Sequence, residues 1–312
     1  MIRRYGYIAF ASAAFLAPML APTPAKAQLW TWTKDQMVEY TKGWTGERFP
    51  DGRPKVPDQW LERAQDMSQE EVSIPGGRGG GGGYSQYEGD WRVLHPELHM
   101  TGRAFTVSFM PARTDLDQIV IAKAREKGVQ TFNNQYAMDM LQPGDIMVVD
   151  LYGKKEGGTI VGDNLFYYIM KTTRGNTKNG GLVVDGSFRD LDGIADMLMP
   201  CYYRAVHPSA IGGATLAAIN VPIRVGNVTV MPGDLVMGDK EGVSFIPPQN
   251  AEAILNSADR LHIHDEWTRK KFDEGKYKSS EIYSSPKDPA LVKEYQEYLT
   301  KKLAELEAAR KK

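Results

Sequence analysis

The stretch QPGDIMVVD at residues 142–150 decides the fold class. Pro fixes its own φ and Gly accepts positive φ, so the Pro-Gly pair predicts a tight turn. The apolar residues that follow predict a buried strand. Almost the same phrase, MPGDLVMGD, recurs at residues 231–239. The repeat therefore predicts two tight turns, each of which begins a buried strand.

Strand and helix patterns alternate around these two turns. Residues 104–109 alternate like a strand, and residues 115–127 have the pattern of a helix ended by Gly128. Residues 165–173 have helical character, and residues 181–185 form an apolar strand. Strands that alternate with helices at this spacing predict an α/β core, which we place at residues 100–250.

The residues before this core, 28–99, predict an N-terminal segment of helix and loop. One helix is expected over residues 57–72, capped by Asp58. A Gly-rich loop follows at residues 79–83. It lacks the lysine and the following helix of a phosphate-binding loop, so a flexible loop is the better interpretation.

The residues after the core are charged and helical in pattern. They predict a C-terminal helical arm at residues 251–312. An apolar stripe runs along its last helix, from Leu291 to Leu306. Such an arm cannot bury its stripe alone, so we expect the arm to pack on the core or on a neighbouring subunit.

The first residues have the order of a secretory signal peptide. A basic start is followed by an apolar run at residues 7–20 and by a small-residue cleavage site at Ala27. The run is shorter than the roughly 20 residues that a membrane-spanning helix needs. We therefore expect a signal peptide at residues 1–27, export to the periplasm or beyond, and no membrane contact after cleavage.

Charge and cysteine content exclude further classes of protein. The formal net charge is −1, and cleavage would remove basic residues and leave a mildly acidic chain. Nucleic acid is therefore not expected as a partner, because binding it requires basic patches. Cys201 is the single cysteine, so the chain has neither an internal disulfide nor a cysteine-based zinc site. Its apolar surroundings predict a packed thiol.

Two short stretches carry residues suited to chemistry. GDNL at residues 162–165 opens a helix, and backbone N–H groups at a helix start bind carboxylates; an ordinary helix cap is the alternative. VVDGSFRD at residues 183–190 ends a strand on Arg189 and Asp190. Arg offers a fixed fork to a carboxylate or enolate, and Asp can ligate a hard divalent cation; an exposed ion pair is the alternative.

Six short motifs, taken in their order along the chain, indicate a family resemblance that no single motif indicates. They are the first Pro-Gly-Asp strand, GDNL at 162–165, DGSFRD at 185–190, VPI at 221–223, PGDLV at 232–236 and DKEGV at 239–243. Together they resemble the family of ribonuclease regulator A and 4-hydroxy-4-methyl-2-oxoglutarate aldolase. The resemblance covers roughly residues 101–253, about half of the chain.

The resemblance implies a fold and an assembly. The expected fold is an α/β core of the swivelling phosphohistidine type (β/β/α), here with N-terminal and C-terminal helical extensions. The expected assembly is a homotrimer or homohexamer with active sites at the subunit interfaces. The Gly-rich loop, the arm and an extra polar insert at residues 173–179, expected beside the site, are additions to the plain family core.

The resemblance also implies roles for individual residues. Asp190 is expected to be the one protein side chain on Mg²⁺ or Mn²⁺, and Arg189 to hold the 2-oxo oxygen or enolate. Asp163 is expected to position a water molecule. The substrate carboxylate is expected on the backbone N–H groups of Gly162, Asp163, Asn164 and Leu165. Family members that only regulate ribonuclease lack an acid after the Arg, so Asp190 favours the aldolase side.

The function expected from these parts is a metal-dependent carbon–carbon lyase. It would cleave a small hydroxy-2-oxo acid through a pyruvate enolate, with oxaloacetate decarboxylation as a side activity. One alternative is a non-catalytic ring that binds or regulates a partner. Another is a lyase on an oxidised (keto) sugar.

Overall fold

The computed structural model describes residues 31–73, 86–126, 128–130, 133–283 and 285–310. The predicted signal peptide and the Gly-rich loop at residues 79–83 lie outside the described residues.

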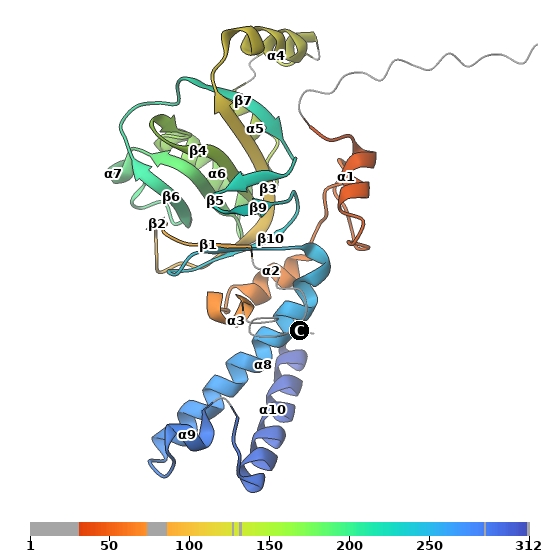
Figure 1. The fold of residues 1–312 in the computed structure, drawn as a ribbon, viewed down its shortest axis with the longest axis vertical. Helices are drawn as coiled ribbons and strands as arrows, with labels where there is room; N and C mark the ends of the chain where they lie inside the picture. Colours follow the sequence, from red (N-terminus) through yellow and green to blue (C-terminus); the bar gives the residue numbers. More distant parts are fainter. Residues whose placement is uncertain (1–30, 74–85, 127, 131–132, 284, 311–312) are drawn as a thin grey trace, which may run out of the picture.

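A large mixed sheet forms the centre of the domain (Figure 1). Within the described residues it has nine strands, in the order β1-β11-β10-β3-β4-β5-β6-β2, with β7 paired to β3. Strands β3 to β6 are parallel neighbours, and the other pairs are antiparallel. The bounds are β1 Tyr87–Glu88, β2 Arg92–Leu94, β3 Met100–Pro111, β4 Asp145–Thr159, β5 Gly181–Phe188, β6 Cys201–Val206, β7 Ala214–Ile219, β10 Leu235–Gly238 and β11 Val243–Ile246. The α/β core predicted from the sequence is confirmed.

Both Pro-Gly-Asp turns are present as predicted. Gly144 has φ +81° and Gly233 has φ +87°, values that favour glycine, and β4 and β10 begin directly after these turns. Each turn is closed by its own Asp: Asp145 accepts from the backbone N–H of Gln142, and Asp234 accepts from that of Met231. The repeated phrase therefore builds the same local structure twice.

Alternating side chains of the parallel strands build two cores, one on each face of the sheet. Phe105, Met147 and Leu182 face α6 (Asp163–Thr173), α5 (Asn134–Met138) and α7 (Leu191–Ile194). Ala104 and Ile146 face a small hairpin of β8 (Ile223–Val225) and β9 (Val228–Val230). Complete burial of one large apolar side chain contributes about 1.5–3 kcal/mol. The two cores therefore hold α6 and the end of β5 in fixed positions.

Cys201 lies fully buried in the core on the α6 face. Burial raises the pKa of its thiol well above the ordinary value, so the reactive thiolate is disfavoured. The prediction of a packed thiol is confirmed.

The N-terminal segment differs from its prediction in one helix. Residues 57–72 form two short helices, α2 (Asp58–Ala64) and α3 (Gln69–Ser73), after α1 (Lys34–Tyr40). The expected single helix is wrong because Ser68 and Glu71 exchange backbone and side-chain hydrogen bonds, which start a new helix. The expected cap by Asp58 is also wrong, since its carboxylate pairs with Arg103.

The sheet begins earlier than the expected boundary at residue 100. Strands β1 and β2 precede that residue, and they pair with β11 and β6. Helix α4 (Thr114–Glu126), followed by Gly128 with φ +83°, agrees with its prediction.

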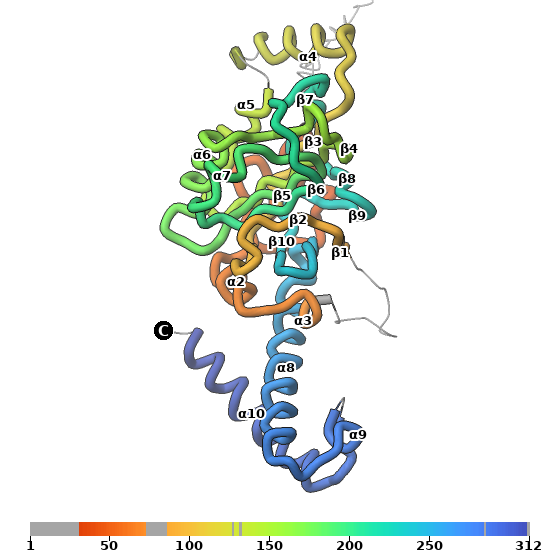
Figure 2. The backbone as a smooth tube through the Cα atoms, turned by 90° about the vertical axis from the view of Figure 1, so that its left-hand side faces the viewer, coloured from red at the N-terminus to blue at the C-terminus, as the bar shows by residue number. Residues whose placement is uncertain are grey.

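The C-terminal arm is a hairpin of helices that projects from the domain (Figures 1 and 2). It consists of α8 (Pro248–Asp273), the short α9 (Ser279–Ile282) and α10 (Pro289–Arg310). The stripe on α10 packs mainly on the rest of the arm, through Trp267 and Ile282 against Leu291. The expectation that the arm packs on the core is confirmed for the first half of α8, where Ala251, Leu255 and Ala258 join a buried cluster with Leu235 and Met237. The stripe on α10 is covered within the arm, because α8 runs beside α10 and supplies an apolar face. No helix in the described residues combines the length and apolar character that a bilayer span needs.

Candidate functional site

Arg189 and Asp190 lie at the end of a fully buried strand of the sheet. Every residue of β5 is buried, and the chain leaves the sheet at Arg189. Asp190 then adopts a left-handed backbone (φ 56°, ψ 36°) at the start of α7. Asp is one of the few residues that take this conformation at moderate cost. The turn holds both side chains at the end of β5, where they are 31% and 43% exposed.

Gly162, at the N-terminus of α6, lies directly against this pair. A Cβ atom added to Gly162 would come within 2.5 Å of Asp190 Oδ2 and 2.9 Å of Arg189 Nη2. Contacts below 3.0 Å do not occur for real Cβ atoms, so a side chain at this position would displace one of the two groups. The glycine is therefore required for the close approach of the helix to the Arg-Asp pair.

Two donors approach the same carboxylate oxygen. Arg189 Nε lies 3.4 Å from Asp190 Oδ2, and the backbone N–H of Asp163 donates to Oδ2 at 3.4 Å. Both contacts are long, and Arg189 Nε is buried without a partner of hydrogen-bond geometry in the described chain. The pair therefore has an unpaired hydrogen-bond donor beside a helix N-terminus, an arrangement that suits an anionic ligand.

Some backbone N–H groups in the first turn of α6 already donate hydrogen bonds within the chain. Asp163 Oδ1 accepts from the backbone N–H of Asn164 at 2.7 Å and from the Asn164 side chain at 3.1 Å. Asp163 lies close to Gly193 of α7, so its carboxylate faces the same corner as Asp190. The structure thus brings together Gly162, Asp163, Arg189 and Asp190.

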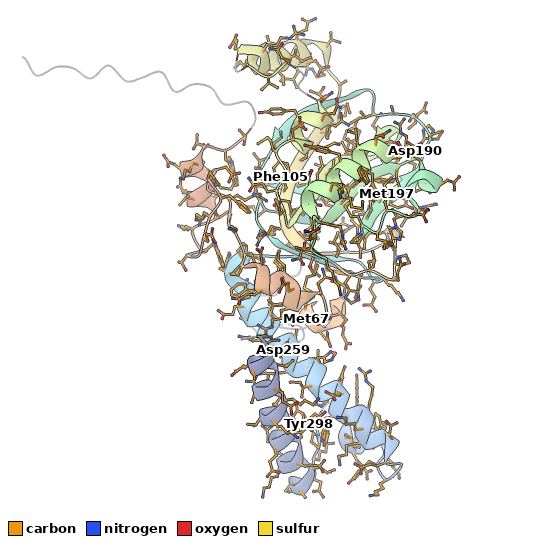
Figure 3. All side chains as sticks on the ribbon, turned by 180° about the vertical axis from the view of Figure 1, so that it is seen from behind. Met67, Phe105, Asp190, Met197, Asp259 and Tyr298 are labelled. Atoms are coloured by element: carbon orange, nitrogen blue, oxygen red, sulfur yellow. The ribbon has the colours of Figure 1, made fainter. Side chains whose placement is uncertain are left out.

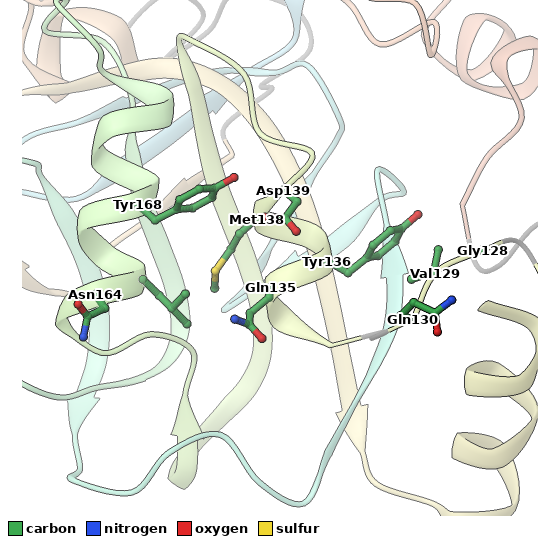
Figure 4. Close-up of a pocket in the computed structure, with 10 residues that line it drawn as sticks. Gly128, Val129, Gln130, Gln135, Tyr136, Met138, Asp139, Asn164 and Tyr168 are labelled. Atoms are coloured by element: carbon green, nitrogen blue, oxygen red, sulfur yellow. The ribbon is translucent and has the colours of Figure 1, made fainter. Parts of the chain in front are cut away.

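Asn164 and Leu165 lie toward a neighbouring cavity of about 720 Å³ (Figure 4). Its other lining residues are Gly128, Val129, Gln130, Gln135, Tyr136, Met138, Asp139 and Tyr168. Burial first, and then the nearby Asp139, raises the pKa of the Tyr168 hydroxyl. Arg189 and Asp190 do not line this cavity, so the first turn of α6 separates it from the charged pair.

The cavity residues on α5 and on the last turns of α6 were missed in the sequence. They carry no motif, and residues 128–139 meet α6 only through the fold. Tyr168 follows GDNL on the same predicted helix, and it was the one lining residue on these elements that the sequence could have associated with the site.

The polar insert at residues 173–179 does not lie beside this site. Asn179 accepts a hydrogen bond from Thr101 at the beginning of β3, and Gly180 donates to the Thr101 carbonyl. Parallel strands begin at one edge of the sheet and end at the other, and Arg189 follows the end of β5. The expectation is wrong within this chain, since the insert occupies the opposite edge.

Asp190 is the carboxylate of the site best suited to a metal ion, because Asp163 Oδ1 already accepts two hydrogen bonds from Asn164. No group of three or more His, Cys, Asp or Glu side chains gathers into a metal site within the described residues. Mg²⁺ keeps several water ligands and is often held by one or two carboxylates. Asp190 is half exposed, and its Oδ1 has no hydrogen-bond partner in the described part of the chain. These residues therefore fit a hydrated divalent cation.

Fold and site together define an α/β protein with an Arg-Asp pair at the end of a buried strand, facing a helix that begins with glycine. A family model described as "RraA-like: Aldolase/RraA" matches residues 79–244. The chain belongs to this RraA-like family.

Relatives and solved structures agree with this assignment. The chain is 36% identical over 130 residues to a putative 4-hydroxy-4-methyl-2-oxoglutarate aldolase of Halalkalibacterium halodurans, covering 42% of this chain and 59% of the relative. A protein of the same description from Ectopseudomonas mendocina is 31% identical, over 35% of this chain and 64% of the relative. The chain thus spans less than two thirds of either relative. The structure of Streptomyces coelicolor RraAS2, described as an unusual member of the RNase ES inhibitor RraA family, is 25% identical with a TM-score of 0.57, over 70% of this chain and 100% of that one.

Proposed function

We propose that this protein is a divalent-metal-dependent lyase that cleaves a carbon–carbon bond of a small hydroxy-2-oxo acid and releases pyruvate. One observation carries the proposal: Arg189 Nε and Asp190 Oδ2 lie 3.4 Å apart, partly exposed, against Gly162. The names of relatives as putative aldolases support the same class of reaction.

Asp190 would hold Mg²⁺ or Mn²⁺, which as a Lewis acid withdraws negative charge from the 2-oxo oxygen of the substrate. The N-terminus of α6, from Gly162 to Leu165, would bind the substrate carboxylate through backbone N–H groups. Asp163 N–H and Asn164 N–H already donate to carboxylates, which would leave Gly162 N–H and Leu165 N–H for this role.

Retro-aldol cleavage breaks the bond between carbons 3 and 4 of the substrate. The 4-hydroxyl loses its proton and becomes a carbonyl, while the bonding electrons form the enolate of pyruvate. Arg189 stays protonated in proteins and would stabilise the enolate oxygen by charge. Asp163 is proposed to orient a water molecule for the proton transfers.

Assembly and export complete the proposal. We propose a homotrimer or homohexamer, supported by large apolar side chains that are exposed on the domain: Ile119 on α4, Tyr167 and Tyr168 on α6, Met140 and Leu198. Export to the periplasm or beyond is supported by the signal-peptide pattern before Gln28.

A pyruvate-release assay tests the function. The substrates are 4-hydroxy-4-methyl-2-oxoglutarate, oxaloacetate and an oxidised sugar acid, each with Mg²⁺ and with EDTA. Pyruvate from a hydroxy-2-oxo acid that EDTA abolishes and Mg²⁺ restores is the expected result. Product formation from the sugar acid without pyruvate would support the sugar lyase instead. The absence of turnover on every substrate, equal for wild type and Asp190→Ala, would support the non-catalytic binding protein.

A further inference from the structure

A second cavity lies at the base of the C-terminal arm, between α2, α8 and the end of α10. Its volume is about 750 Å³, within the range of small-molecule sites. Figure 3 places Asp259 at this base and Asp190 on the far part of the α/β domain. None of the residues from Gly162 to Leu165, nor Arg189 or Asp190, lines it. The cavity is therefore separate from the candidate active site.

Three charged side chains meet in the wall of this cavity. Asp259 is buried, and its Oδ2 accepts from Arg63 Nη2 at 2.5 Å. Arg310 Nη2, near the end of α10, donates to both oxygens of Asp259 at 2.8 Å. Two guanidinium groups thus share one carboxylate, which leaves the trio with a net positive charge.

Both guanidinium groups keep unused hydrogen-bond donors. The Arg63 side chain is 10% exposed, and its buried Nε has no partner in the described chain. Arg310 uses only Nη2 in the hydrogen bonds of the described residues, so Nε and Nη1 are free. A buried donor without a partner destabilises the protein, and an anionic oxygen of a ligand would supply the missing partner.

Apolar groups form the rest of the wall. They come from Trp60, Met67 and Leu306, which belong to three different segments. The carboxylates of Glu62 and Asp66 also line the cavity, but both residues are exposed, at its solvent side. Arg310 is also exposed, at 37%, so water screens these three charges more than it screens the buried Arg63 and Asp259. The inner wall therefore presents the unpaired Nε of Arg63 beside apolar groups, and the outer wall carries Arg310 and two carboxylates.

We propose that this cavity binds a small organic carboxylate with an apolar body. The carboxylate would lie on Arg310 and Arg63, and the apolar body on Trp60 and Leu306. An ammonium group at the outer end of the ligand would add attraction to Glu62 and Asp66, so an amino acid fits better than a plain acid. The proposal is independent of the lyase activity.

Isothermal titration calorimetry of the full chain tests the proposal with three probes of similar size: L-phenylalanine, 3-phenylpropionate and phenethylamine. The expected Kd is about 1 mM or tighter for L-phenylalanine, at least about 3-fold weaker for 3-phenylpropionate, and too weak to measure for phenethylamine. Binding of 3-phenylpropionate equal to that of L-phenylalanine would assign a plain carboxylate. No binding of either acid, or tighter binding of phenethylamine, would overturn the proposal.

Two variants locate the binding. Leu306→Trp places a larger side chain in the cavity and keeps all three charged residues. Arg310→Gln removes one guanidinium group while Arg63 stays on Asp259. Each change is expected to weaken binding of the acids at least about 10-fold. Glu307→Trp, at an exposed neighbouring position, and Asp190→Ala should bind as wild type does. Leu306→Trp should also keep its pyruvate-release rate. Unchanged binding in both Leu306→Trp and Arg310→Gln, or loss of binding in Asp190→Ala, would contradict the site.

Discussion

Arg53 and Asp145 form a buried, two-pronged ion pair that fixes the N-terminal segment to the first Pro-Gly-Asp turn. Arg53 Nη1 lies 2.7 Å from Asp145 Oδ1, and Nη2 lies 3.0 Å from Oδ2. Both side chains are almost fully buried, and the guanidinium also stacks on the Phe49 ring. The same carboxylate closes the turn that begins β4. Residues outside the family core therefore complete a turn inside it.

Removal of this arginine should destabilise the fold strongly. Arg53→Met leaves the Asp145 carboxylate buried and unpaired, which costs about 3–5 kcal/mol of unfolding free energy. Lys55→Met is the control, because the exposed Lys55–Glu47 pair contributes less than about 1 kcal/mol. Urea unfolding measures both, and equal stability of the two variants would show that the buried pair is not essential.

The second Pro-Gly-Asp turn should make stability depend on pH. Asp234 is buried, has no ion-pair partner in the described chain, and burial raises its pKa to about 7. The unfolded chain releases this proton near pH 3.9 and the folded chain near pH 7. The folded state therefore binds the extra proton in between, and stability falls as pH rises from about 4 to about 7, by at most about 4 kcal/mol.

Asp234→Asn removes this titration and keeps an oxygen for the Met231 N–H. Its unfolding free energy should change less between about pH 5 and about pH 8 than that of the wild type, in urea titrations at both values. An identical pH dependence in the two proteins would place the titrating group elsewhere.

Gly162→Ala should abolish activity and spare the fold. The new methyl group would press on Asp190 Oδ2 and Arg189 Nη2, both at the ends of side chains that can move, so the pair would open without unfolding. We expect the rate of pyruvate release to fall by about 100-fold or more. Gly212→Ala is the matched control, since no atom lies within 4 Å of its added Cβ. Similar rates in the two variants would show that a side chain at position 162 does not disturb Arg189 and Asp190.

The elements of the core could be predicted where local chemistry decides them. The Pro-Gly turns, the strands after them and the helix before Gly128 depend on residues that are neighbours in sequence. The Arg-Asp pair also follows from one strand end. The family resemblance placed Gly162 in the same site, but its close approach to the pair is seen only in the structure.

The features that the sequence did not predict depend mostly on contacts between segments that are distant in the chain. The helix expected over residues 57–72 is divided because Ser68 and Glu71 start a new helix, and their capping box is a local pattern that could have indicated it. Asp58 does not cap the first helix because Arg103, from a distant segment, pairs with its carboxylate, and no local pattern indicates that contact. The insert at residues 173–179 follows α6 in sequence but lies at the edge where β5 begins, because a helix between parallel strands returns the chain across the sheet. The apolar stripe on α10 packs against α8, and this contact depends on the hairpin that the two helices form.

The most direct test of the central claim is Mn²⁺ binding followed by electron paramagnetic resonance, with oxalate as a mimic of the pyruvate enolate. Wild type should bind Mn²⁺, and oxalate should tighten that binding. Asp190→Ala should weaken Mn²⁺ binding by about 10-fold or more, because the carboxylate ligand is lost. Arg189→Gln should keep Mn²⁺ binding and lose most of the oxalate effect. Mn²⁺ binding by Asp190→Ala as tight as that of the wild type would contradict the account.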